Sequence, residues 1–374
     1  MRAAAPSPDA SFSLTEARAI VRDLFVPDAR IYWIDFLFTI VLGHIFYALA
    51  RALSLSDIEP WGIKLLFVGA AFVVQCACYY RAVMFVHEIV HLPEKKLRVF
   101  RVVWNLLCGI PFLVPSFTYY THLDHHRRKW FGTDHDGEYL PLARMSLVWI
   151  LAYLTQGLWV PPLVVLRFGV IVPLTWLSPS LRRWIHQHAS SLVMDPSYIR
   201  PLPTASALRI IRLQEMACFF FIWMCPLFSL VVLGHWPVPL LVQGYATAVV
   251  LVTMNSVRTL ASHRWSSTGH EGTFVDQMLD SVTLDNDSLL AILINPVGLR
   301  YHATHHLFPS IPYHQIRTAH LRLLAQLPVN SPYRLTVERS IWPVISKLWQ
   351  TATRCREHAE DSVSVVEQWQ VVRS

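Results

Sequence analysis

His122-Leu-Asp-His125-His126 and His302-Ala-Thr-His305-His306 are two copies of one pattern, HxxHH, that lie about half a chain apart. A third cluster, His87-Glu-Ile-Val-His91, precedes both copies. On a helix, positions i, i+3 and i+4 share one face, so each cluster can present two or three imidazoles to a common point. Because histidine accounts for only 18 of 374 residues, chance repetition is a poor explanation. These eight histidines predict a metal site.

The chain is too apolar for an ordinary soluble protein, with 53% hydrophobic and only 15% charged residues. Soluble domains carry about 25% charged residues. Four windows are long enough to cross a bilayer, which takes about 20 apolar residues: residues 31–53, 63–86, 216–233 and 237–257. Segments 99–120 and 145–177 are also apolar, but they contain prolines and internal arginines, so we expect interfacial or re-entrant helices there.

The number of crossings between histidine clusters must be even if all the histidines reach one site. Four crossings at the windows above satisfy this condition, provided that both ambiguous segments enter and leave on one side. The net charge is +7, and basic residues gather beside the clusters, as at Arg127, Arg128 and Lys129. By the positive-inside rule, the histidine site and both termini are predicted to be cytoplasmic. Such basic runs beside membrane spans contact lipid headgroups, so we expect no nucleic-acid binding.

We therefore predict an all-α integral membrane protein with about four transmembrane helices, interfacial or re-entrant helices and a cytoplasmic, histidine-rich cap. Residues 1–30 are expected to form a cytoplasmic N-terminal segment. Residues 31–350 form the membrane domain, and residues 351–374 form a polar C-terminal tail.

Eight imidazoles exceed the needs of one structural zinc ion, which is usually four-coordinate. Shared between two ions, they supply about four ligands each and leave room for other ligands. Imidazole suits iron, zinc, copper and nickel, so the ligand type alone does not name the metal.

The order HxxxH, HxxHH, HxxHH resembles that of the integral-membrane fatty acid desaturases and the related fatty acid hydroxylases. The likeness extends to the segment after the second box, residues 131–140 (FGTDHDGEYL), and to the end of the third, residues 305–313 (HHLFPSIPY). It covers roughly residues 85–324. In that family the boxes hold two non-haem iron ions that activate dioxygen, and the electrons come from a separate carrier.

The resemblance implies a ninth ligand, because the family places a further histidine after the last membrane span. His263 occupies that position here. The implied iron ligands are His87, His91, His122, His125, His126, His263, His302, His305 and His306. The implied activity is oxygen-dependent insertion of a double bond into the acyl chain of a fatty acid or lipid.

The implied partners are the lipid substrate, membrane lipids and a separate electron carrier. No GxGxxG fingerprint and no room for a fused carrier domain are evident, so a ferredoxin or a cytochrome b5-like protein with its reductase must supply electrons.

Carboxylates near the boxes are candidates for holding a ligand histidine in place, because such histidines usually donate their other N–H to a carboxylate or carbonyl. Glu88 and Asp124 qualify by proximity, and Asp276, Asp280 and Asp285 are weaker candidates. Some relatives hold a metal-bound water with an asparagine one turn before the ninth histidine. That position is Thr259 here, while Asn255 lies two turns back.

Two alternatives stay open from the sequence. The same iron centre can produce a hydroxyl group, as in membrane hydroxylases or in alkane- and carotenoid-modifying oxygenases. A more remote alternative is a metal-binding membrane protein without catalytic activity. His135 lies among acidic residues beside the second box, but we expect it to be an exposed polar residue.

Overall fold

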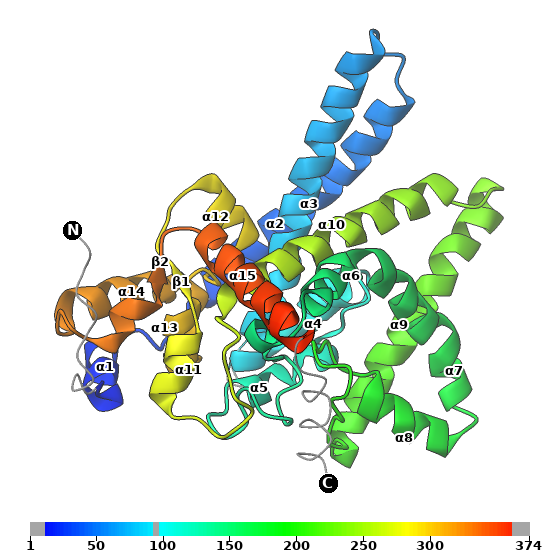
Figure 1. The fold of residues 1–374 in the computed structure, drawn as a ribbon. Coiled ribbons are helices and arrows are strands. Elements are labelled where there is room, and N and C mark those ends of the chain that lie inside the picture. Colours follow the sequence, from blue (N-terminus) through cyan, green and yellow to red (C-terminus); the bar gives the residue numbers. More distant parts are fainter. Residues whose placement is uncertain (1–11, 93–96, 361–374) are drawn as a thin grey trace.

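The computed structural model describes residues 12–92 and 97–360, and the fold in this part of the chain is almost entirely helical (Figure 1). The long helices are α2 (Ala29–Leu55), α3 (Trp61–His91), α6 (Leu147–Leu166), α9 (Ala205–Leu233), α10 (Val238–Ser262) and α15 (Ile341–Glu360). The short α-helices are α1 (Leu14–Ile20), α4 (Arg98–Trp104), α5 (His122–His125), α7 (Val172–Thr175), α8 (Pro179–His188), α11 (Phe274–Asp280), α12 (Leu289–Ile294), α13 (His302–Leu307) and α14 (Tyr313–Gln326). Two-residue strands β1 (Thr283–Leu284) and β2 (Val337–Glu338) pair in parallel.

Helices α2 and α3 form a hairpin that projects from the rest of the molecule (Figure 1). The Asp28 side chain caps α2 by accepting a hydrogen bond from the backbone N–H of Arg30. At 27 residues and about 1.5 Å per residue, α2 is longer than the roughly 30 Å hydrocarbon core of a bilayer. Gly43 allows close packing of the two helices, because a Cβ there would lie 2.5 Å from the Tyr79 ring. Large apolar side chains on the outer faces of the hairpin are exposed, as lipid contact requires.

In the part of the chain that the structure describes, five helical segments are long and apolar enough to cross a membrane, one more than the sequence predicted. Four match the expected windows, and the fifth, Leu147–Thr175, is one of the two segments that we expected to lie at the interface. It is not a regular helix, because the π-helix η4 (Arg167–Ile171) separates α6 from α7. The other ambiguous segment is broken into α4, the π-helix η1 (Asn105–Gly109) and the 3₁₀ helix η2 (Ser116–Tyr119), and it is not a candidate span.

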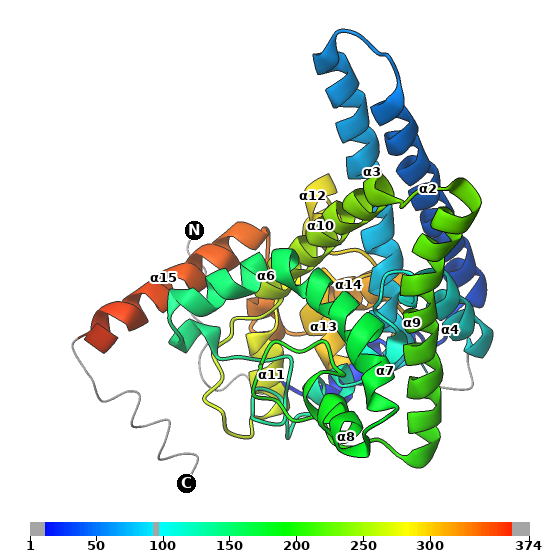
Figure 2. The same cartoon turned by 90° about the vertical axis from the view of Figure 1, so that its right-hand side faces the viewer.

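The position of the histidines limits how many of these helices cross completely. His126 precedes α6 and His263 follows α10, and the two residues belong to adjoining histidine groups described below. Three full crossings between them would place them on opposite sides of the membrane. A short turn joins α9 to α10, so these two helices can cross in opposite directions, and we retain the expectation that the Leu147–Thr175 segment does not cross (Figure 2).

The histidine-bearing elements lie at the base of the α2–α3 hairpin and form a cap with the C-terminal part of the chain (Figures 1 and 2). Helix α13 contacts α11, α14 and β1, while α5 contacts the end of α3. Helix α1 packs on α14, and α15 lies along α6 and α10. The 3₁₀ helices η3 (Leu142–Arg144) and η5 (Pro332–Thr336) complete the cap. These contacts hold histidines from four distant segments around one volume.

Some features expected from the sequence fall outside the described part of the chain. They are residues 1–11 of the N-terminal segment and residues 361–374 of the C-terminal tail. Helix α15 continues past residue 351, where we expected the tail to begin, and ends at Glu360.

Candidate metal centre

The last turns of α3 present His87 and His91, which are spaced i, i+4 and share one face of the helix. The second box is a single helical turn, α5, with His126 as its C-terminal cap. The third box is the short helix α13, which begins at His302. His263 follows the last residue of α10, and its backbone bridges to Ser281 after α11.

These nine histidines form two compact groups, in which the ligand nitrogens lie within 4.8 Å of one another. The first group has five members: His87, His91, His122, His126 and His305. The second group has four members: His125, His263, His302 and His306. The structure thus brings together every histidine that the sequence and the family resemblance selected.

The two HxxHH boxes divide between the groups in opposite ways. In the second box the outer pair, His122 and His126, joins the group of five, and His125 joins the group of four. In the third box the outer pair joins the group of four, and His305 joins the group of five. The i, i+4 pair of a helical turn shares one face, whereas the i+3 residue is rotated away from the last member. Each box therefore bridges both groups.

The Nε2 atoms converge within each group. In the group of five, the His305 Nε2 lies 3.2 Å from the His91 Nε2 and 3.1 Å from the His126 Nε2. In the group of four, the His263 Nε2 lies 3.1 Å from the His125 Nε2 and 2.8 Å from the His302 Nε2.

The partner of each Nδ1 atom determines the tautomer of the ring, and so determines whether the Nε2 lone pair is free to bind a cation. The His125 Nδ1–H donates to the Asp136 Oδ2 at 2.8 Å, and this leaves the His125 Nε2 unprotonated in the neutral ring. The Asp280 Oδ2 lies 3.2 Å from the His263 Nδ1, and its negative charge favours a proton on that nitrogen, which leaves the His263 Nε2 unprotonated as well. Two unprotonated nitrogens 3.1 Å apart repel each other unless a cation lies between them. The donor set therefore fits a metal ion.

Burial favours the neutral imidazoles that metal ions require. It lowers the pKa of His126, His302 and His306 well below the ordinary value, and the neighbouring imidazoles lower it further. His125 is the exception, because the Asp136 carboxylate outweighs burial and raises the pKa of His125.

The group of five has a carboxylate of its own. The His122 Nδ1 lies 2.8 Å from the Glu138 Oε2, and the His122 ring stacks on Tyr119. Both nitrogens of His87 are buried without a hydrogen-bond partner, which is the state of a ligand awaiting an ion.

The structure corrects the carboxylates predicted from proximity. Asp124 forms an ion pair with Arg127 at 3.1 Å rather than contacting a histidine. Glu88 lies 4.0 Å from the His87 Nδ1, but its hydrogen bonds come from the Tyr32 hydroxyl and the Tyr313 backbone. Glu88 therefore anchors α2 and α14 to α3.

The role predicted for Asn255 beside the metal ligands is also wrong, because its Oδ1 accepts a hydrogen bond from Arg258 and contacts no histidine. The polar groups that sequence reasoning missed are Asp136, Glu138 and Gln277, whose amide lies 3.1 Å from the His306 Nδ1. Two of them, Asp136 and Glu138, belong to the HDGEY stretch after the second box. The acidic residues of that stretch could therefore have been predicted to contact the histidines. His135, in the same stretch, is exposed and belongs to neither group, as expected.

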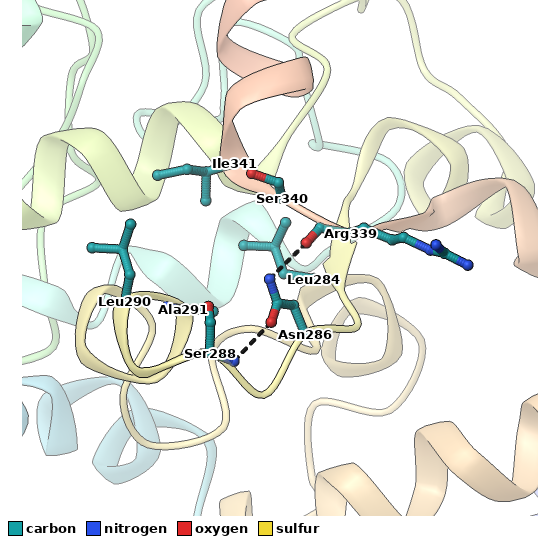
Figure 3. A pocket seen from close by; sticks show the side chains of 8 residues that line it. All are labelled: Leu284, Asn286, Ser288, Leu290, Ala291, Arg339, Ser340 and Ile341. Atoms are coloured by element: carbon teal, nitrogen blue, oxygen red, sulfur yellow. Dashed lines mark hydrogen bonds between the residues drawn. The ribbon is translucent and has the colours of Figure 1, made fainter.

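A pocket elsewhere offers no rival site. It lies where β1, the start of α12 and the start of α15 meet, and no histidine lines it (Figure 3). Its polar groups satisfy one another: the Asn286 amide donates to the Arg339 carbonyl at 2.9 Å and accepts from the Ser288 N–H at 2.7 Å. A smaller cavity borders the metal-site histidines, with His87, Glu88 and His305 in its wall.

An all-α chain with five membrane-length helices and two groups of buried histidines defines a class of polytopic membrane proteins built around a histidine-rich centre. The sequence profile of a family described as fatty acid desaturase matches residues 64–337. The chain therefore belongs to the fatty acid desaturase family of membrane oxidoreductases. It is also similar to a ceramide hydroxylase from Caulobacter vibrioides (strain NA1000 / CB15N), with 34% identity over 343 residues that cover 90% of this chain and 93% of the relative.

Proposed function

We propose that this protein is an oxygen-dependent membrane enzyme that oxidises an unactivated methylene in the acyl chain of a fatty acid or lipid at a centre of two iron ions. The observation that carries the proposal is the division of nine histidines, seven of them buried, into adjoining groups of five and four. A non-catalytic carrier has no need of two adjoining groups bridged by both boxes.

The group of five would hold one iron ion and the group of four the other. When bound, the two ions supply dioxygen activation, which a methylene needs because it offers no acidic proton to a general base. The chain orients the ligands through Asp136 and Glu138. It also excludes water, since seven of the nine histidines are buried and His91 and His126 are partly exposed.

Desaturation is the outcome that we propose first, because the segment after the third box resembles acyl desaturases and the family bears that description. Hydroxylation is the second candidate, and the relative described as a ceramide hydroxylase favours it. Both outcomes begin with removal of hydrogen from a methylene. They differ in whether a second hydrogen leaves or oxygen is added.

Electrons are proposed to come from a separate ferredoxin or a cytochrome b5-like carrier with its reductase. From the positive-inside rule, the cap, the carrier and both termini are proposed to lie on the cytoplasmic side. The purified protein should therefore be inactive with NAD(P)H alone, and turnover without an added carrier would contradict this part of the proposal.

The test is expression in a host with simple lipids, followed by lipidomics with localisation of double bonds and hydroxyl groups. Loss of two hydrogens identifies desaturation, and gain of one oxygen identifies hydroxylation. A His305→Ala variant removes one ligand of the group of five and should abolish the product. His135→Ala is the matched control, because it removes an exposed histidine outside both groups. Product formation by the His305→Ala variant would overturn the assignment.

A further inference from the structure

Arg258 is a buried arginine on α10, about one turn before His263, and it is only 6% exposed. Its hydrogen bonds go to neutral oxygens: Nη2 donates to the Thr259 hydroxyl at 2.9 Å and to the Asn255 Oδ1 at 3.2 Å. Its Nε–H is buried without an acceptor. Over residues 12–92 and 97–360, no carboxylate oxygen lies within ion-pair distance of this guanidinium.

Two other buried arginines, Arg167 and Arg200, differ from Arg258 in part. Arg167 donates to the Glu215 carboxylate at 2.6 Å and to the Ser190 hydroxyl at 3.1 Å, although its Nη1 also lacks an acceptor. Arg200 forms no ion pair either and donates to the Ser190 carbonyl, whereas Arg258 lacks both a carboxylate partner and an acceptor for its Nε–H. An uncompensated charge in a protein interior costs several kcal/mol. A buried cation with a free donor therefore needs an explanation beyond packing.

The surroundings of Arg258 are polar and adjoin both histidine groups. Helix α10 contacts both α3 and α6 (Figure 2), and these helices bring the Tyr80 hydroxyl beside Arg258 and Tyr153 against Thr259. The guanidinium is within electrostatic reach of His122 and of His302, one from each group.

One carboxylate near the centre, Glu138, is within electrostatic reach of Arg258. Its Oε2 bonds His122 and its Oε1 is buried without a hydrogen-bond partner, but neither oxygen forms an ion pair with Arg258. Metal ions at the two groups would add further positive charge beside the guanidinium. An electronegative oxygen from a bound ligand would stabilise the guanidinium in that setting.

We propose that Arg258 binds the carbonyl oxygen of the acyl substrate and so fixes which methylene is oxidised. This inference rests on the proposed function, since it assumes a lipid at the histidine centre. Apolar walls hold a hydrocarbon chain in any register, whereas one charge-assisted hydrogen bond at a fixed distance from the centre selects a single register. Because Arg258 lies on the last turns of α10, which His263 caps, the oxidised methylene would lie close to the carbonyl end of the chain.

The test uses the full-length protein in detergent and equilibrium binding of radiolabelled N-palmitoylsphinganine, palmitate and hexadecane. The first two probes carry the carbonyl oxygen as an amide or a carboxylate, and hexadecane has none. Arg258→Met should weaken binding of a carbonyl probe about ten- to a hundred-fold, as expected for one hydrogen bond from a charged group, and leave hexadecane unchanged. Arg258→Lys should restore part of the affinity, and the exposed Arg209→Met serves as the matched control. If only one carbonyl probe responds, that probe identifies the carrier form of the substrate.

Stability and iron content separate substrate binding from a structural role. Removing an unpaired buried charge should leave the unfolding midpoint and iron content of Arg258→Met at or above the wild-type level. Equal affinity of Arg258→Met and wild type for both carbonyl probes would overturn the proposal, as would a loss of iron and stability with unchanged affinity. If Arg258→Met does not fold, the proposal depends on Arg258→Lys, which must bind the carbonyl probes more weakly than wild type.

Turnover distinguishes this inference from the proposed function. If the wild type oxidises no lipid, but Arg258→Met binds the carbonyl probes more weakly than the wild type does, the proposed reaction is refuted and the carbonyl-binding role of Arg258 stands. A wild-type protein that oxidises lipids, with KM and position of attack unchanged in Arg258→Met, refutes the inference and keeps the reaction.

Discussion

Replacement of Asp136 by asparagine is the sharpest test of the group of four. Asp136 is 1% exposed. Its Oδ2 accepts from the His125 Nδ1–H at 2.8 Å and from the Gly132 N–H at 2.9 Å, and its Oδ1 accepts from the Glu138 N–H at 3.1 Å. An asparagine has one oxygen for these three donors. If the oxygen faces His125, the amide NH₂ opposes the Glu138 N–H; if it faces Glu138, His125 changes tautomer and points an N–H at the metal position.

The size of the effect follows from two independent magnitudes. Replacing a charged acceptor by a neutral one weakens a hydrogen bond by about 1–1.5 kcal/mol, and an amide NH₂ that faces another donor adds a similar cost. Removal of a carboxylate that orients a metal-ligating histidine weakens metal binding about 10- to 100-fold, which corresponds to about 1.4–2.7 kcal/mol. The two free energies agree. Asp136→Asn should therefore weaken the binding of one metal ion about 10- to 100-fold and leave the binding of the other nearly unchanged.

The assay is iron content per chain during titration with a chelator, measured by mass spectrometry of the metal. Wild type should release two ions at the higher chelator concentrations, whereas Asp136→Asn should release one of them at a concentration about 10- to 100-fold lower. Asp134→Asn is the matched control, because Asp134 is an exposed carboxylate two residues away. Identical release curves for Asp136→Asn and wild type would refute the role of Asp136.

Three further predictions concern stability, each measured by thermal unfolding in detergent. Arg167→Met breaks a buried ion pair and leaves the Glu215 carboxylate uncompensated, so it should destabilise the fold by about 3–5 kcal/mol; an unchanged midpoint would contradict this. Gly298→Ala should destabilise by about 1–3 kcal/mol, because its φ is +71° and a Cβ would lie 2.7 Å from a side chain of α14; Gly269→Ala, at φ +83° with open space around it, should show the backbone strain alone. Burial lowers the pKa of His320 from 6.5 to about 4, so the unfolded chain binds a proton that the folded protein excludes. The contribution of neutral His320 to the free energy of unfolding is therefore fully present above pH 6.5 and falls by up to about 3 kcal/mol as the pH drops toward 4. His320→Gln should flatten this pH dependence. An unaltered slope in the variant would contradict the prediction.

The membrane helices were predictable because hydrocarbon thickness imposes a length and composition that can be read from sequence. Four expected windows coincide with long helices, and the two proline-bearing segments are indeed irregular. The Leu147–Thr175 segment is longer and more continuous than we predicted, since it reaches the length of a membrane span despite Pro161 and Pro162. Its arginine is accommodated by Glu215 from α9, a tertiary partner that no local pattern reveals.

The carboxylates show where proximity in sequence fails. Asp124 lies inside the second box, but one position along a helix turns a side chain by about 100°, so it faces Arg127 rather than a histidine. Asp136 reaches His125 because the chain after α5 folds back in turns. Asp280 reaches the side of His263 because α11 ends beside the end of α10.

By itself, the sequence selected the eight histidines of the three boxes, because helical spacing places the two or three histidines of a box on neighbouring faces whatever surrounds them, and the family resemblance added His263. Helical spacing alone says nothing about how separate boxes meet. Only the tertiary structure decided that His305 joins the residues of the first and second boxes while His125 joins His263 and the third. It likewise decided that Asp136 and Glu138 face the ligands and that Arg258 is left without a carboxylate. These outcomes depend on the relative rotation and depth of packed helices, which contacts between distant segments set.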